Sequence, residues 1–190
     1  MKAKFWTGDK LLSVAAVLVS LLTLGVFGYQ TNLIRQQQYM SVYPHLSFSN
    51  KFSGSLQYQY VLKNDGIGPA MIDSVLVVGP NGKEYLDLVY YVDDVIPPED
   101  SILYLHSNIS SGKLIPPNVE IPLIQLVNHE LLAKLGINDV ATLPQNDVQD
   151  AKQLFSILNH DSLTIQITYK SIYGEKWLIK SGSGSPVKLD

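Results

Sequence analysis

The sequence lacks cysteine altogether and is poor in arginine, and both features narrow the classes of function open to it. The absence of cysteine excludes a disulfide framework, a thiolate zinc site, a catalytic thiol and lipid attachment through a Cys side chain. Arg35 is the only arginine among 14 basic residues, and 17 acidic residues give a formal net charge of -3. Because a nucleic-acid-binding protein needs a more cationic surface, we expect no nucleic-acid partner.

Charged side chains are also scarce, at 16% of the residues, where roughly 25% is usual for soluble domains. The scarcity is greatest near the N-terminus, where no charged residue occurs from Leu11 to Ile34. As a helix rising about 1.5 Å per residue, this segment would extend roughly 36 Å, more than the about 30 Å of a bilayer's hydrocarbon core. The sequence therefore predicts a transmembrane helix over residues 11–34.

The charges that flank this segment predict its orientation. Lys2, Lys4 and Lys10 precede the segment, opposed by Asp9, whereas Arg35 alone follows it closely. By the positive-inside rule, the N-terminus is cytoplasmic and the rest of the chain is periplasmic or extracellular. A cleaved signal peptide is the alternative, but its apolar region would be shorter and an Ala-x-Ala site would follow. We therefore prefer an uncleaved signal anchor.

Small residues inside the predicted span mark where helices could pack in lipid. Ala16 and Ser20 lie four residues apart, and Gly25 with Gly28 adds a notch at three-residue spacing. Small side chains allow helices to approach closely in a bilayer, so these four positions are candidates for helix packing and self-association.

The pattern of the sequence changes from helical to alternating at Pro44. This change predicts four parts of the chain: a cytoplasmic tail (1–10), the transmembrane signal anchor (11–34), a helical stalk (35–43) and an exported domain (44–190). Three of the 14 basic residues and one of the 17 acidic residues precede position 35, so the remainder has 11 basic and 16 acidic residues, a net charge of -5. The negative net charge of this domain disfavours binding to anionic lipid headgroups.

Alternating apolar residues predict strands in the exported domain. The alternation is clearest in Leu56–Leu62 and in Ser162–Lys170. The other predicted strands are Leu46–Ser49, Ala70–Val78, Glu84–Tyr91, Ser101–His106 and Trp177–Ser181, the last forming a hairpin with Ser162–Ser171. Short strands separated by Gly, Pro and Asn turns are typical of an antiparallel β-sandwich.

Two short helices are predicted within this domain, as an insertion at about residues 127–158. Val127–Leu135 carries leucines at helical spacing and stops at Gly136. Asn146–Leu158 has Asn146 in the cap position, and its expected apolar face consists of Val148, Ala151, Phe155 and Leu158. The expected fold is therefore mainly β, with an N-terminal transmembrane helix and a sandwich that contains a two-helix insertion.

One turn resembles those of known exported modules. The segment Asn64-x-Gly66-x-Gly68-Pro69-Ala70 between two strands resembles a turn common in bacterial immunoglobulin-like (Ig-like) modules. Together with the anchor, it resembles uncharacterised bacterial single-pass membrane proteins that carry an exported Ig-like domain. The resemblance covers residues 44–107 and 162–181. Because the Cys pair of antibody domains is missing, it implies an Ig-like architecture and no site residues.

The histidines and carboxylates lack the spacing of known catalytic or metal sites. His45, His106, His129 and His160 are far apart, and His129-Glu130 lacks a second His at position 133. Four carboxylates around a Pro-Pro turn could hold calcium, or act as an acid and base pair on a sugar, but they match no EF-hand loop. These carboxylates are Asp93, Asp94, Glu99 and Asp100. We therefore expect no catalytic residue, no metal and no cofactor.

Aromatic and charged residues suggest an interaction surface instead. Tyr90 and Tyr91 are adjacent, so in a strand one of them must point outward beside Asp93 and Asp94. Lys134 and Lys152 mark the outer face of the helical insertion and complete the candidate surface.

Three hypotheses of function follow. In the first, the protein is a non-enzymatic membrane-anchored subunit whose Ig-like domain binds a protein partner or its own copies. In the second, it is a small envelope hydrolase or carbohydrate-binding module that uses the acidic loop and the tyrosines. In the third, it is an inert structural subunit whose transmembrane helix is the working part. A deep pocket with two carboxylates would favour the second.

Overall fold

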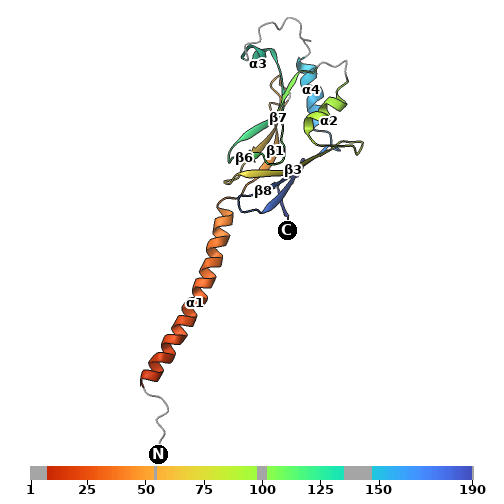
Figure 1. Cartoon of the computed structure of the whole chain (residues 1–190). Helices are drawn as coiled ribbons and strands as arrows, with labels where there is room; N and C mark the ends of the chain where they lie inside the picture. The colour runs from red at the N-terminus through yellow and green to blue at the C-terminus, as the bar shows by residue number, and fades with distance from the viewer. Residues whose placement is uncertain (1–7, 54, 98–101, 135–146, 190) are drawn as a thin grey trace, which may run out of the picture. The chain divides into compact units, whose positions relative to one another are not determined.

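The computed structural model describes residues 8–53, 55–97, 102–134 and 147–189. The chain forms two compact units, Met1–Ser41 and Val42–Asp190, and each is described by itself. Figure 1 labels their elements.

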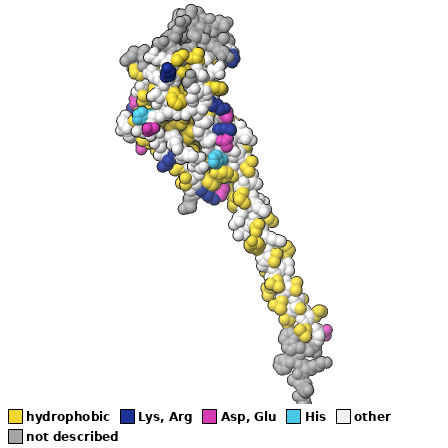
Figure 2. Space-filling view, turned by 180° about the vertical axis from the view of Figure 1, so that it is seen from behind, with side chains coloured by type: hydrophobic (Ala, Val, Ile, Leu, Met, Phe, Trp, Pro, Cys, Tyr) yellow, Lys and Arg dark blue, Asp and Glu magenta, His cyan; other side chains and the backbone are white. Residues whose placement is uncertain are grey.

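The first unit consists of the helix α1 (Gly8–Met40), which is 33 residues long and extends beyond the predicted span at Ile34. Its hydrophobic side chains are exposed along its length (Figure 2). Among the described residues, α1 is the one helix that is long and apolar enough to cross a membrane. An apolar helix with no buried residue has no packing partner within its own unit.

The second unit contains two antiparallel sheets. In the first sheet the strand order is β1-β2-β7-β5, and in the second it is β10-β9-β8-β3-β4, with β6 also pairing with β3. The bounds of the first sheet are β1 (Leu46–Lys51), β2 (Gln59–Asn64), β7 (Glu120–Leu126) and β5 (Tyr104–His106). Those of the second are β10 (Val187–Leu189), β9 (Lys176–Lys180), β8 (Thr164–Lys170), β3 (Ala70–Val78), β4 (Glu84–Tyr85) and β6 (Leu114–Ile115).

Residues from both sheets form one hydrophobic core. In β8 the alternation predicted from sequence is confirmed, because Ile165, Ile167 and Tyr169 are buried while the residues between them are half-buried. Ile167 lies opposite Val75 of β3 on one side and opposite Ile179 of β9 on the other. The hairpin of β8 and β9 is therefore part of the core.

The predicted strand Glu84–Tyr91 is wrong. β4 ends at Tyr85, and α2 (Leu88–Val95) follows, with the Asp87 side chain capping the helix by accepting a hydrogen bond from the Val89 backbone N–H. The reason is the spacing of the apolar residues: Leu88, Tyr91 and Val92 are buried at positions i, i+3 and i+4, which is a helical face. An Asp in the cap position begins such a helix.

β7 lies in the interior of the first sheet but was not predicted from the sequence. Its Pro122 lacks a backbone N–H and normally argues against a central strand. Pro122 is tolerated because the register of β2 against β7 shifts at this point: Val61 lies opposite Pro122, whereas Tyr60 lies opposite Ile124. Within sheets, proline is confined to edge strands, to the first residue of a strand and to such irregularities.

Two short helices lie in the range predicted for the helical insertion, α3 (His129–Lys134) and α4 (Asp147–Leu158). The expected cap at Asn146 lies outside the described residues. The apolar face of α4 differs from the prediction, because Val148 is 57% exposed while Leu154 is fully buried together with Ala151. The cause is packing, since α4 contacts α2 and β7 (Figure 1).

Candidate interaction surfaces

The two adjacent tyrosines lie on α2 and not on a strand. Tyr91 is 2% exposed, and its ring packs edge-on against Tyr85 with the centroids 5.6 Å apart. Tyr90 is 59% exposed. Successive residues of a helix point about 100° apart, which suffices to bury one ring and expose the other. The prediction that one tyrosine is exposed was right, although its structural reason was wrong.

Asp93 and Asp94 hold α2 against neighbouring elements. The Tyr85 hydroxyl donates a hydrogen bond to Asp94 Oδ2 over 2.6 Å, and Lys83 Nζ approaches the same oxygen to 2.9 Å. These two contacts lower the pKa of the Asp94 carboxyl. The Tyr104 hydroxyl of β5 donates to Asp93 Oδ1. Both carboxylates thus have partners inside the domain, although both remain exposed beside Tyr90, and Tyr91 is the buried member of the predicted patch.

The predicted acidic cluster is only partly within the described residues, because Glu99 and Asp100 lie outside them. Within the described ranges, no group of three or more His, Cys, Asp or Glu side chains could hold a metal ion. Two histidines make local contacts through Nδ1. His45 Nδ1 lies 3.3 Å from the hydroxyl oxygen of Tyr43. His160 Nδ1 accepts a hydrogen bond from the Ser162 backbone N–H.

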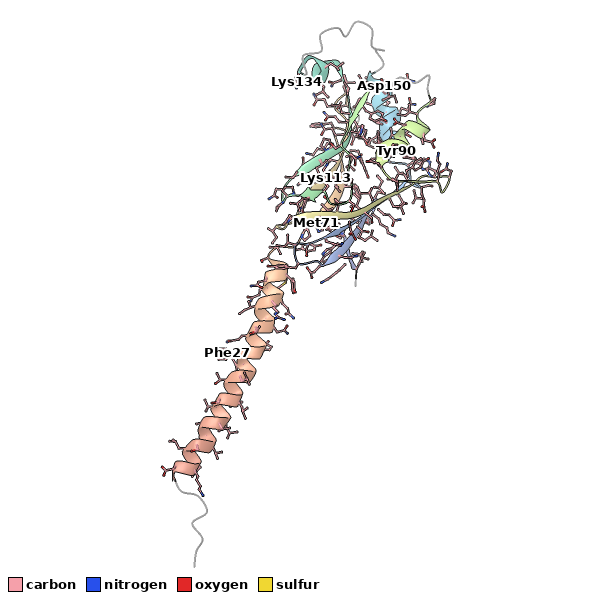
Figure 3. All side chains as sticks on the ribbon, viewed as in Figure 1. Phe27, Met71, Tyr90, Lys113, Lys134 and Asp150 are labelled. Atoms are coloured by element: carbon pink, nitrogen blue, oxygen red, sulfur yellow. The ribbon has the colours of Figure 1, made fainter. Side chains whose placement is uncertain are left out.

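The two lysines of the candidate surface are exposed and lie on helices other than α2. Lys134 ends α3 and Lys152 lies on α4. Figure 3 shows Lys134 and Tyr90 on separate helices. Lys134 also lines a shallow polar hollow of about 150 Å³ together with Gln57 and Gln125. Apart from the buried Tyr91, the predicted surface is therefore a set of exposed positions on three helices.

The small residues of α1 have free space around them. A Cβ added at Gly25 or at Gly28 would meet no atom within 4 Å. The Ser20 hydroxyl donates to the Ala16 carbonyl oxygen over 2.8 Å, which satisfies this hydroxyl within the helix. Polar groups satisfied in this way can reside in a hydrocarbon environment.

Sequence reasoning missed an apolar row on the outer face of the second sheet. Met71 of β3 and Leu114 of β6 are cross-strand partners, and they are 44% and 51% exposed. On its other side, β3 pairs with β8, where Lys170 lies opposite Met71. Ile172 follows Lys170 by two residues and is 54% exposed. We name Met71, Leu114 and Ile172 the apolar row; Figure 3 labels Met71 and the adjacent Lys113. The exposure of Met71 was readable from its alternation with buried Ala70 and Ile72.

Charged groups lie directly beside the apolar row. Lys170 Nζ contacts Asp73 Oδ1 at 2.6 Å, and Lys176 Nζ lies 3.4 Å from the other oxygen of the same carboxylate. The two ammonium groups lower the pKa of Asp73, Lys170 contributing most. An apolar strip bordered by partly exposed ion pairs has the composition of a protein interface with a polar rim.

No known protein-family model, curated protein or solved structure gives a significant match to this chain. Its function must therefore be inferred from its own residues.

Proposed function

We propose that this protein is a single-pass, membrane-anchored and non-enzymatic subunit for protein interaction or complex assembly, with an Ig-like domain outside the cytoplasm. The observation that carries the proposal is α1, an apolar helix of 33 residues with no buried residue, followed directly by a compact β domain. A helix of this length and composition suits a bilayer, where its apolar side chains need no protein partner.

The order of the strands supports an Ig-like architecture. In Ig domains the strands are arranged as ABED in one sheet and as GFC in the other, and C′ extends the second sheet in variable-type domains. Here β1, β2, β7 and β5 take the places of A, B, E and D, while β9, β8, β3 and β4 take those of G, F, C and C′. The helices α3 and α4 then lie in the connection between E and F.

The charge distribution supports an exported domain. Lys2, Lys4 and Lys10 precede the apolar run and only Arg35 follows it closely, so the N-terminus is cytoplasmic.

A topology reporter tests this orientation. A reporter that is active only outside the cytoplasm, fused after Asp190, is expected to be active in intact cells. A reporter that is active only in the cytoplasm, fused at the same position, serves as the matched control and should be silent. Activity of the cytoplasmic reporter with silence of the exported one would contradict both the orientation and the localisation.

The apolar row supports a protein partner. Met71 and Leu114 lie side by side on paired strands, and Ile172 follows the end of the strand that also pairs with Met71, whereas singly exposed hydrophobic residues are common on any surface. The domain's negative net charge disfavours anionic lipid as the occupant. We therefore assign the row to a protein that resides in or next to the same membrane.

Site-specific photocrosslinking in native membranes tests the assignment. A photoreactive residue at Met71 or Leu114 is expected to form a protein adduct of defined mass. The same residue at Asn81, in the exposed turn between β3 and β4, is the control and should form none. Lipid adducts alone at Met71 would contradict a protein partner. Protein adducts from Gly28 but not from Met71 would instead support the hypothesis in which the transmembrane helix is the working part.

A further inference from the structure

A cleft of about 360 Å³ lies between β1, the C-terminal end of α4 and the turn that joins β9 to β10. Its residues are distinct from those of the apolar row. Asn50 of β1 and Asn159, just after α4, both line it, so we name it the Asn50–Asn159 cleft. The volume is in the range of small-ligand sites.

Two amide side chains are held in place across this cleft. Asn50 Nδ2 donates to Asn159 Oδ1 over 2.6 Å, and the Tyr58 hydroxyl donates to Asn50 Oδ1 over 2.6 Å. Asn159 Nδ2 in turn donates to the Phe155 carbonyl oxygen over 2.8 Å. Burial raises the pKa of Tyr58 to about 12, so its hydroxyl remains a donor at neutral pH. Asn159 Nδ2 also donates to Asn50 Oδ1 over 3.2 Å, which occupies the second lone pair of that oxygen. The second N–H of Asn50 and the second lone pair of Asn159 Oδ1 remain for a ligand, and both asparagines are exposed to solvent.

The inner wall of the cleft is apolar. Phe48 and Tyr60 line it with their rings stacked, the centroids being 5.9 Å apart at an angle of 14°. Tyr60 is buried and Phe48 is only half-buried, so the Phe48 ring contributes the accessible apolar surface. The cleft thus combines an aromatic wall with a polar rim.

His160 and Asp161 add a donor and an acceptor at the rim, and both are exposed. Because His160 Nδ1 accepts from the Ser162 backbone N–H, the neutral ring carries its proton on Nε2. Asp161 is the one carboxylate among the lining residues, which include no Lys or Arg. The C-terminal end of α4 adds partial negative charge. This cleft therefore repels anions and offers hydrogen bonds to neutral hydroxyl groups.

We propose that the Asn50–Asn159 cleft binds a sugar residue of an uncharged saccharide. A sugar ring has an apolar face that fits an aromatic wall and an edge of hydroxyl groups that both donate and accept. The amides, the imidazole and the carboxylate supply the matching acceptors and donors. Glycoside hydrolysis ordinarily needs two carboxyl groups, and the cleft has Asp161 alone, so the saccharide is bound without being cleaved.

This site differs from the one expected from the sequence, where sugar binding was assigned to the acidic loop and the tyrosines. Tyr90, Tyr91, Asp93 and Asp94 are absent from the cleft lining. The proposal does not depend on the apolar row or on a protein partner.

Binding is tested by titrating the full-length protein with maltose, cellobiose and N-acetylglucosamine in isothermal titration calorimetry. The detergent is lauryldimethylamine oxide, because alkyl maltosides carry a sugar headgroup that would compete for the cleft. We expect at least one of the three sugars to bind with a Kd below about 10 mM. Glucose and glucuronic acid are titrated as a matched pair, and glucuronic acid is expected to bind about tenfold more weakly than glucose. Cellobiose should be recovered intact.

Two rim variants locate the site. Asp161→Asn and His160→Ala are each expected to weaken binding about tenfold, whereas Glu84→Gln, an exposed acid outside the cleft, should leave it unchanged. Unchanged urea unfolding of each variant, followed by Trp177 fluorescence, shows that the fold is retained. The proposal is overturned if none of the three sugars binds, or if a sugar binds both rim variants as tightly as it binds the wild-type protein.

Discussion

Replacement of Asn64 by alanine is expected to destabilise the domain by about 3 to 5 kcal/mol, because it leaves several buried polar groups without partners. Asn64 ends β2, and its side chain is fully buried. Its Oδ1 atom accepts hydrogen bonds from the backbone N–H of Gly66 over 3.0 Å and from that of His45 over 3.2 Å. The side chain thus ties the start of β1 to the loop that follows β2.

The other half of the amide faces three carbonyl oxygens. Asn64 Nδ2 lies 2.9 Å from the Gly68 oxygen, 3.0 Å from that of Ile115 and 3.2 Å from that of Pro116. Asn64→Asp keeps the acceptor but turns a carboxylate toward these oxygens. We therefore expect Asn64→Asp to be at least as destabilising as Asn64→Ala at neutral pH, since a buried charge without a donor is costly.

Urea unfolding of the full-length protein in detergent measures this effect. In a Trp6→Phe background, Trp177 is the remaining tryptophan and reports on the domain, where its ring packs edge-on against Tyr43 with the centroids 4.7 Å apart. Asn81→Ala is the matched control, because Asn81 accepts a single backbone hydrogen bond in an exposed turn. Its cost should be about 0.5 kcal/mol. Equal costs for Asn64→Ala and Asn81→Ala would contradict the assigned role.

Ile167→Ala is expected to cost about 2 to 5 kcal/mol, the range for removing a large aliphatic side chain from a packed core. Ile167 is 1% exposed and lies between Val75 and Ile179 on the central strands of the second sheet. Those neighbours are strand residues that cannot move inward without breaking ladder hydrogen bonds. The vacated volume should therefore remain largely unfilled.

Gln166→Ala is the matched control for Ile167→Ala, because the two residues are adjacent on β8 and point to opposite faces. We expect Gln166→Ala to cost roughly 0.5 kcal/mol or less. The same urea titration measures the free energy of unfolding of both variants, and the two values are compared at equal slope of that free energy against urea concentration. A cost for Ile167→Ala that is no larger than that of Gln166→Ala would show that the inner face of β8 is not core.

The sequence by itself determined the elements that depend on local pattern. The uncharged run from Leu11 to Ile34 can form only a helix that tolerates an apolar environment, and α1 contains all of it. Strict alternation from Ile165 to Tyr169 determined which face of β8 is buried. Period and turn chemistry suffice in these places because neighbouring residues in the chain supply the whole signal.

Only the tertiary structure decided which of two local patterns prevailed. The segment from Leu86 to Tyr91 is rich in strand-favouring residues, yet the Asp87 cap and the packing of Tyr91 against Tyr85 select a helix. β7 carries Pro122 and is nonetheless an interior strand, because the pairing of β2 with β7 is irregular beside it, where Leu123 of β7 has no partner in the register. Intrinsic strand propensity is weak compared with such packing terms.

The candidate sites were also decided by tertiary structure, because their members come from distant parts of the chain. Asn50 and Asn159 are 109 residues apart in sequence but share a hydrogen bond. Met71 meets Leu114 only because the short strand β6 returns to β3. Periodicity reports which side of an element is buried, but it does not report which other element lies across from it. That choice depends on how the two sheets pack and close one shared core, a property of the whole domain.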